Sequence, residues 1–154
     1  DLDSNRMEQH NRHLQEKYKE IAEKETRFEE IQCDDAEYVI VAYGSSARIA
    51  QKTIQLGRAE GIKIGLLRPI TLWPFPTKAI EALIAKGVKG FLSVELSCGQ
   101  MIEDVKLACN GRAKAEHFGR VGGIIHTPEE VLEAMKKQII GSNRKIWFMK
   151  NQNC

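Results

Sequence analysis

Apolar residues recur every seven positions near the start of the chain, at Met7, Leu14, Ile21 and Phe28. No glycine or proline interrupts residues 4–32. Because this spacing places the four side chains on one face of a helix, the pattern predicts a single long helix over residues 4–32. The apolar stripe is thin, so we expect the helix to lie across the rest of the chain or across a partner.

Beyond residue 33 the pattern changes to short apolar runs that alternate with helical segments. Strands are predicted at residues 38–43, 62–67, 88–94 and 116–120, and helices at residues 47–60, 77–86 and 98–110. Thr127, Pro128 and Glu130 predict a last helix, since threonine caps a helix start and glutamate three residues later caps it in return. Alternating strands and helices predict an α/β fold with helices on both faces of a mostly parallel sheet of four or five strands.

These patterns divide the chain into three parts. We expect an N-terminal helical linker at residues 1–33, an α/β domain at residues 34–141 and a C-terminal tail at residues 142–154. The tail mixes basic and aromatic residues at positions 144–150. That mixture fits a partner-binding end or a strand that covers the domain.

A proline-rich segment at residues 67–76 separates a predicted strand from a predicted helix. It contains three of the four prolines and one of the two tryptophans. Proline fixes its own φ and favours an extended residue before it, so Arg68, Phe75 and Trp73 are held in a stiff loop. Two interpretations stay open: Leu72, Trp73 and Phe75 fold back onto the core, or they face a partner.

Composition narrows the classes of function. The 154 residues suffice for one domain with an appendage, and the formal charge of +2 gives no electrostatic case for a nucleic acid or a membrane surface. No apolar run approaches the ~20 residues that span a bilayer, and the N-terminus lacks the apolar core of a signal peptide. We therefore expect a soluble cytoplasmic protein.

Cysteine and histidine spacing indicates no metal centre. Cys33, Cys98, Cys109 and Cys154 are far apart and form no Cys-x-x-Cys motif, so neither an iron–sulfur cluster nor structural zinc is expected. A disulfide framework is not expected either. The histidines, at positions 10, 13, 117 and 126, lack ligand spacing with acidic neighbours and are interpreted as surface or core residues.

Four loops follow predicted strands, and the carboxyl ends of parallel strands meet at one edge of a sheet, where ligands and partners bind. The four loops are Gly44, Ser45 and Ser46, then residues 68–76, which begin at Arg68, then residues 95–100 and residues 120–123. Glycine and serines that lead into a helix fit an anion site, although the pattern favours Ser45 or Ser46 as an ordinary helix cap. The segment carries neither a Walker lysine nor a Gly-x-Gly-x-x-Gly motif.

The loop at residues 95–100 is ambiguous in the same way. Ser97 with Gln100 three residues later fits a capping box, and Glu95 at a strand end fits a hydrogen-bonding role better than that of a general acid. Cys98 at a helix start is a candidate nucleophile, but no base lies beside it in the sequence. No set of nucleophile, base and oxyanion donors follows from spacing alone.

Three segments together resemble a known family. They are residues 38–46 (YVIVAYGSS), residues 67–76 (LRPITLWPFP) and residues 94–101 (VELSCGQM). In this order they resemble the C-terminal part of the alpha subunit of 2-oxoacid:ferredoxin oxidoreductases, most closely the branched-chain 2-oxoacid (2-oxoisovalerate) type. The resemblance covers roughly residues 34–140.

The resemblance implies a transketolase C-terminal-like domain, with three α/β/α layers around a mainly parallel sheet of about five strands. Such enzymes decarboxylate a 2-oxoacid on thiamine diphosphate with Mg²⁺, pass electrons through iron–sulfur clusters to ferredoxin and give the acyl group to coenzyme A. None of these cofactors is expected in this chain, since their sites belong to other parts of the complex. The implied partners are the N-terminal pyrimidine-binding domain of the same subunit, the diphosphate-binding subunit, the gamma and iron–sulfur subunits and ferredoxin.

On this interpretation the chain is an assembly domain with no turnover of its own. Arg68, Trp73 and Phe75 are the candidates for an interface or the substrate entrance, followed by Glu95 and Gln100. The alternative is a free-standing regulatory domain that binds a nucleotide or another anion at Gly44, Ser45 and Ser46. An independent enzyme that uses Cys98 is the third hypothesis.

Overall fold

The computed structural model of the chain describes residues 3–141. Cys154 and the tail at residues 142–154 lie outside the described residues, so the hypotheses about the tail stay predictions. The division of the chain at residues 33 and 141 likewise stays a prediction.

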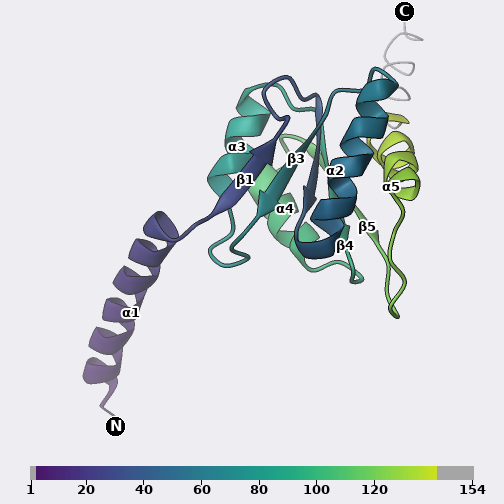
Figure 1. Cartoon of the computed structure of the whole chain (residues 1–154). Helices are drawn as coiled ribbons and strands as arrows, with labels where there is room; N and C mark the ends of the chain where they lie inside the picture. Colours follow the sequence, from purple (N-terminus) through teal and green to yellow (C-terminus); the bar gives the residue numbers. More distant parts are fainter. Residues whose placement is uncertain (1–2, 142–154) are drawn as a thin grey trace, which may run out of the picture.

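Strands and helices alternate from residue 38 onward, as the sequence predicts (Figure 1). The strands are β1 (Phe28–Ile31), β2 (Tyr38–Ala42), β3 (Ile64–Pro69), β4 (Gly90–Glu95) and β5 (Lys114–Gly119). The helices are α1 (Ser4–Lys24), α2 (Gly44–Ala59), α3 (Thr77–Ala85), α4 (Met101–Cys109) and α5 (Pro128–Ala134), and α5 continues into a π-helical segment, η1 (Met135–Ile140).

The sheet has the order β1-β3-β2-β4-β5. Strands β3, β2, β4 and β5 are parallel, and β1 joins the β3 edge in the antiparallel direction. On the central strand, Ile40 is level with Leu66 of β3 and Leu92 of β4. The predicted mainly parallel five-stranded sheet is therefore confirmed.

Alternate residues of the strands face opposite layers of helices. Val39, Val41 and Phe91 pack against α3 and α4 in one buried cluster. Ile40 and Leu92 pack against α2, α5 and η1 in the other. Because a strand buried on both faces needs apolar residues at every position, β2 and β4 read as continuous apolar runs. The three-layer α/β/α architecture follows from this pattern and is confirmed.

The long N-terminal helix is shorter than predicted. It ends at Lys24, with Glu25 as its last capping residue, and Phe28 lies in β1. The heptad spacing continues to Phe28 by coincidence, but pairing with β3 overrides it: the Arg27 carbonyl accepts hydrogen bonds from the amides of Ile70 and Thr71, and Thr71 Oγ1 accepts one from the Arg27 amide at 3.0 Å. The prediction of helix over residues 25–32 was wrong.

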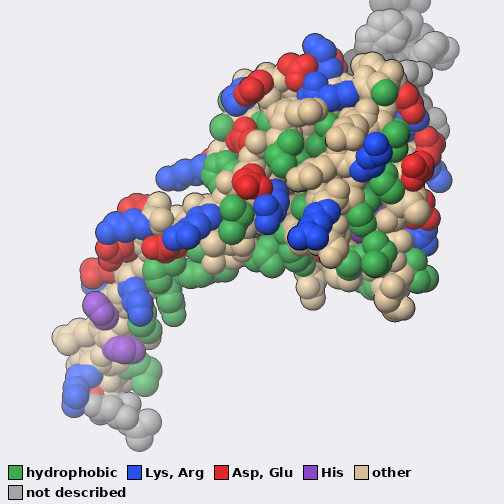
Figure 2. Space-filling view, in the orientation of Figure 1, with side chains coloured by type: hydrophobic (Ala, Val, Ile, Leu, Met, Phe, Trp, Pro, Cys, Tyr) green, Lys and Arg blue, Asp and Glu red, His purple; other side chains and the backbone are tan. Residues whose placement is uncertain are grey.

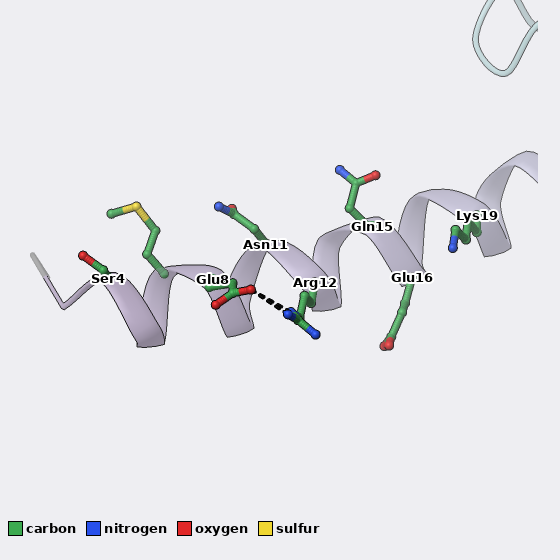
Figure 3. A pocket seen from close by; sticks show the side chains of 8 residues that line it. Ser4, Glu8, Asn11, Arg12, Gln15, Glu16 and Lys19 are labelled. Carbon is green, nitrogen blue, oxygen red and sulfur yellow. Dashed lines mark hydrogen bonds and ion pairs between the residues drawn. The ribbon is translucent and has the colours of Figure 1, made fainter.

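Helix α1 extends away from the α/β body (Figure 1). None of its residues is buried. Its contact with the body includes Tyr18, whose ring meets the Trp73 ring edge to face at a centroid distance of 5.8 Å. A broad hollow along Met7, Asn11 and Gln15 is lined by residues of α1 alone, and the side chains in Figure 3 point away from a single helix. That hollow is an open helix surface with no second wall among the described residues.

The last helix begins as the sequence predicts. Thr127 Oγ1 accepts a hydrogen bond from the Glu130 amide at 3.2 Å, and Glu130 Oε2 accepts one from the Thr127 amide at 2.9 Å. Pro128 occupies the first helical position. The capping box is confirmed.

Candidate functional site at the carboxyl edge of the sheet

The four predicted loops lie along one edge of the sheet. The parallel strands β2, β3, β4 and β5 end at Ala42, Pro69, Glu95 and Gly119, and the loops follow these ends at the lower border of the body in Figure 1. The sequence alone does not give the order of the strands. Since β2 lies between β3 and β4, the loop at Gly44 has the loops after β3 and β4 as neighbours.

The loop after β2 is short because α2 begins at Gly44, three residues earlier than predicted. Gly44 has φ +57, a left-handed conformation that favours glycine. The residue before the helix is Tyr43, which makes no side-chain capping hydrogen bond. The alternative in which Ser45 or Ser46 caps the helix is therefore wrong, since both lie within its first turn.

The first turn of α2 opens into a hollow of about 670 Å³. Gly44 and Ser45 line it together with Arg48, Gln51 and Arg68. The amides of a first helical turn have no intrahelical acceptor, and the positive end of the helix dipole attracts anions. Two guanidinium groups and these amides therefore make the hollow electropositive. The sequence singled out Gly44, Ser45 and Arg68 separately but missed Arg48 and Gln51, which lie one and two helical turns further on.

Arg68 is not free in this hollow. Its Nη1 donates a hydrogen bond to Glu29 Oε2 of β1 at 2.7 Å, and both side chains are partly exposed. Glu29 is level with Arg68 in the antiparallel pair, which holds the two side chains on the same face of the sheet edge. An incoming anion would share this guanidinium with Glu29.

Ser46 points elsewhere. It is buried, and its Oγ lies 3.1 Å from Nε2 of His126, a residue that precedes α5. Burial lowers the pKa of His126, so the neutral ring is favoured at neutral pH. Phe118 packs against the same imidazole at a centroid distance of 5.6 Å. Ser46 thus connects α2 to the loop after β5 instead of facing the hollow.

The start of α4 is organised differently, around Glu95. This carboxylate is 1% exposed and accepts hydrogen bonds from the amides of Gln100, Met101 and Ile102 at 2.9 to 3.0 Å. The hydroxyls of Ser93 and Ser97 donate to it at 2.9 and 3.0 Å. Desolvation raises the pKa of Glu95, but the hydrogen bonds from these amides and hydroxyls outweigh it and hold the pKa below its ordinary value.

Glu95 therefore acts as an ionised cap of α4, in agreement with the hydrogen-bonding interpretation. The predicted Ser97–Gln100 capping box was wrong, because the Gln100 amide bonds to Glu95 and the helix begins at Met101. Ser97 Oγ instead accepts from the Gly99 amide at 3.3 Å. Cys98 is exposed in this loop, three residues before the helix, so it does not occupy the helix start that its candidacy as a nucleophile assumed.

The proline loop after β3 combines both interpretations that the sequence left open. Phe75 packs against the buried cluster under α3 and α4, whereas Trp73 is 62% exposed and Leu72 is also exposed. Pro74 and Pro76 are buried, the Trp73–Pro74 peptide bond is cis, and Thr71 Oγ1 donates to the Pro74 carbonyl at 2.9 Å. The loop is thus fixed to the body through its prolines and Phe75, and it presents Trp73 outward.

Exposed apolar side chains gather at this edge. Of the large apolar residues that the described part exposes, most lie in the loops after β3, β4 and β5: Ile70, Leu72, Trp73, Leu96, Val121, Ile124 and Ile125. We call this set the apolar rim. Figure 2 shows apolar side chains along the lower border of the body and continuing under α1. Contiguous apolar surface of this kind marks an interaction site more often than a solvent-exposed face.

Residues 3–141 contain no group of three or more His, Cys, Asp or Glu side chains that could hold a metal ion. Cys33 and Cys109 are buried, and burial raises the pKa of each thiol to about 11. Within the same described residues, no helix is both long and apolar enough to cross a membrane.

The fold and its edge define an α/β domain of the transketolase C-terminal type, and comparison with solved structures agrees. A 2-oxoglutarate:ferredoxin oxidoreductase from Magnetococcus marinus, solved with 2-oxoglutarate, coenzyme A and succinyl-CoA bound, has a TM-score of 0.70 at 20% identity, over 89% of this chain and 24% of that chain. A split-gene transketolase, an inactive beta4 tetramer, has a TM-score of 0.61 at 17% identity, over 72% of this chain and 40% of that chain. At these identities the likeness shows the fold.

Sequence comparison identifies the family. Residues 36–131 match the model of pyruvate:ferredoxin oxidoreductase core domain II, and the chain belongs to this family. It is 48% identical over 136 residues to the ketoisovalerate oxidoreductase subunit VorB of Methanothermobacter thermautotrophicus, which is 88% of this chain and 38% of that subunit. The 2-oxoglutarate synthase subunit KorA of Methanothermobacter marburgensis is 34% identical over 64% of this chain and 26% of that subunit. The resemblance predicted from three loop motifs is confirmed, and the chain spans 38% of the length of the VorB subunit that it matches.

Proposed function

We propose that this chain is the assembly domain of a thiamine-diphosphate-dependent 2-oxoacid:ferredoxin oxidoreductase. The reaction of the whole complex is the oxidative decarboxylation of a branched-chain 2-oxoacid, of the 2-oxoisovalerate type, to an acyl-CoA. The observation that carries this proposal is the 48% identity to a ketoisovalerate oxidoreductase subunit over 88% of the chain. Thiamine diphosphate, Mg²⁺ and iron–sulfur clusters belong to other parts of that complex, which we place in the cytoplasm.

The apolar rim supplies the physical basis of assembly. Interfaces that form stable complexes are enriched in aromatic side chains and arginine, and these residues carry much of the binding energy. Trp73 offers the largest exposed apolar side chain of the rim, and Arg68 is the next-to-last residue of β3, the strand that leads into the proline loop. The proposed partner for this edge is the N-terminal pyrimidine-binding domain of the same subunit. The diphosphate-binding, gamma and iron–sulfur subunits, and ferredoxin through them, complete the complex.

The candidate residues contribute in different ways. Trp73 and Arg68 contact the partner directly, and Phe75 holds the proline loop against the body so that Trp73 keeps its position. Glu95 and Gln100 fix the loop after β4 at the start of α4. This edge would then border the coenzyme A or active-site entrance of the assembled enzyme.

The test is co-purification of the tagged chain from cells that also express the pyrimidine-binding domain and the other subunits. We expect the unaltered chain to recover that domain together with a thiamine-diphosphate-binding subunit, and Trp73→Ala to reduce the recovery of both at least several-fold because an aromatic anchor is lost. Leu107→Ala is the matched control, since Leu107 is 78% exposed but lies on α4 outside the rim. Equal recovery with Trp73→Ala and Leu107→Ala would contradict the rim as the interface.

A second candidate function is a regulatory domain that binds a nucleotide or another anion. The electropositive hollow at Gly44, Ser45, Arg48 and Arg68 is the observation in its favour. Calorimetry with inorganic phosphate and with ATP distinguishes the two functions. Tight binding by the isolated chain that Arg48→Ala abolishes would favour regulation, and the absence of binding would leave assembly as the function of this edge.

A further inference from the structure

The loop between β5 and α5 projects from the lower border of the body (Figure 1). All of residues 121–125 are exposed, and Gly122 and Gly123 in the middle of the loop both have positive φ. Three of the seven members of the apolar rim lie in this loop, each more than half exposed: Val121, Ile124 and Ile125. The position of this part of the rim therefore depends on what holds the loop.

His126 fastens the loop to the body. Its side chain is buried, with 3% of the residue exposed, whereas the residues on either side of it, Ile125 and Thr127, are exposed. The ring lies with Nε2 3.1 Å from Ser46 Oγ in the first turn of α2, and Phe118 of β5 packs against it. The loop is thus attached to α2 and β5 through one imidazole.

Both ends of the loop are held without His126. At the end of β5, the Arg120 amide donates a hydrogen bond to the Glu95 carbonyl at 3.2 Å. At the start of α5, Thr53 Oγ1 of α2 donates to the Pro128 carbonyl, also at 3.2 Å. Loss of the imidazole contact would therefore release the loop between two fixed ends and leave α5 in place.

The site around His126 fits a neutral imidazole and not a charged one. A protonated ring carries a hydrogen on both nitrogens, so each nitrogen then needs an acceptor. Nε2 has the Ser46 hydroxyl, but Nδ1 is buried and has no hydrogen-bond partner among the described residues. A proton on Nδ1 would therefore be a buried donor without an acceptor, which is unfavourable relative to water.

The charged groups around the ring do not compensate for this loss. Glu130 of α5 favours the charged ring and Arg120 opposes it, while the contacting side chains of α2 and β5, Ser46 and Phe118, are uncharged. The Glu130 carboxylate is already engaged, since it accepts hydrogen bonds from Arg120 Nη2 and from the Thr127 amide. A charged ring is therefore more stable in water than in its docked position.

We propose that His126 is a pH-dependent latch, which holds the loop of residues 121–125 on the body when the ring is neutral and releases it when the ring is protonated. Release displaces three rim residues, so acid weakens the contact of the rim with the pyrimidine-binding domain. This second half of the inference rests on the proposed function.

The direction of the pH dependence follows from the position of the ring. Burial holds the pKa of docked His126 below its ordinary value of 6.5, and a ring released into water returns to that value. Between these two pKa values, each fall of one pH unit raises the ratio of released to docked loop by up to about tenfold. The docked loop is therefore favoured at neutral pH, and release begins as the pH falls below 6.5.

Heteronuclear NMR of the full 154-residue chain tests the latch without a partner. The pH is lowered from about 7.5 to about 5.5, across the ordinary pKa of histidine. The amide resonances of residues 121–125 should move toward those of an unfolded chain with the same midpoint as the His126 ring, and their order parameters should fall below about 0.6. The amides of β2 should not change, which shows that the body stays folded.

Three variants separate the latch from other effects of pH. His126→Gln has no titrating ring and should abolish the pH dependence of the loop, whereas His10→Gln, on the exposed α1, should retain it. Ser46→Ala leaves the histidine in place but removes the partner of Nε2, and should therefore move the release to higher pH. Loop resonances that do not respond to pH, or that respond equally in His126→Gln, would overturn the latch.

Co-purification of the tagged chain with the pyrimidine-binding domain at the same two pH values tests the second half. The unaltered chain should recover several-fold less of the domain at the lower pH, and His126→Gln should recover similar amounts at both. Equal recovery by the unaltered chain at both pH values would overturn the control of assembly and leave the proposed function intact. No recovery at either pH would overturn the proposed function together with this second half, while the NMR result still decides the latch.

Discussion

Two helices begin at the carboxyl edge of the same sheet, and their first turns are occupied in opposite ways. The first turn of α4 is filled from within by the Glu95 carboxylate, which accepts three helix-start amide hydrogen bonds and is almost fully buried. The first turn of α2 has no side-chain cap and opens into a hollow beside Arg48 and Arg68. The comparison shows that a strand followed by a helix start does not by itself make an anion site. A carboxylate of the protein itself, here that of Glu95 at the end of β4, can already occupy the amides of the helix start.

Removal of the internal cap should have the largest effect. Glu95→Ala leaves three helix-start amides and the hydroxyls of Ser93 and Ser97 without their acceptor, and we expect a loss of about 3 kcal/mol in the free energy of unfolding. Urea unfolding followed by circular dichroism measures it. Glu129→Ala, an exposed glutamate in the first turn of α5, serves as the control and should change stability by less than about 0.5 kcal/mol. Equal effects of both variants would contradict the capping role of Glu95.

Removal of the buried Ser46–His126 contact, which joins α2 to the loop after β5, should have an intermediate effect on stability that depends on pH. Burial holds the pKa of His126 below its ordinary value of 6.5, so the unfolded chain binds the proton more readily than the folded one. The contribution of the neutral His126 ring to the free energy of unfolding is therefore fully present above pH 6.5. It is lost as the pH falls from 6.5 toward the pKa of His126 in the folded chain. His126→Gln should flatten this part of the stability profile, and His10→Gln on the exposed α1 should leave it unchanged. A profile that keeps its slope in His126→Gln would assign the titration to another group.

The smallest effect on stability is expected when the first turn of α2 is given a carboxylate, as Glu95 provides for α4. Ser45→Asp places a carboxylate in the first turn, next to the free amides and the two arginines, and should stabilise the chain by about 0.5 kcal/mol. The same change should weaken any binding of phosphate at the hollow, because its carboxylate occupies the anion position. Ser45→Asn, which is similar in size but neutral, is the control for both measurements. Unchanged stability and unchanged phosphate binding in Ser45→Asp would mean that the first turn of α2 is not the positive site described here.

The sequence was most informative where the deciding contacts are local. The capping box of α5 joins residues three positions apart, Thr127 and Glu130, and was predicted correctly. Glu95 caps α4 across five to seven positions of loop, a span that no helix-start rule covers, and the i, i+3 pattern of Ser97 and Gln100 gave the wrong cap in its place.

Contacts between distant segments set the limits of prediction in the rest of the site. Gly44 and Arg68 line one hollow because β2 and β3 are neighbours, and Ser46 meets His126 across 80 positions of sequence. Neither strand order nor such a pairing is written in the pattern of apolar residues. Residue Phe28 illustrates the reverse error, since its heptad position predicted a helix where backbone pairing with Pro69 produced a strand.

The edge strand β1 also determines how the chain would carry mechanical load. Helix α1 leads into β1 over residues 25–27, and β1 is hydrogen-bonded along its length to β3 (Figure 1). A force that pulls the chain at α1 along the direction of β1 would therefore strain the hydrogen bonds of the β1–β3 ladder together, in shear, instead of opening them one after another. Such a force on α1 would be transmitted as a whole to β3, which ends at Pro69 before the proline loop.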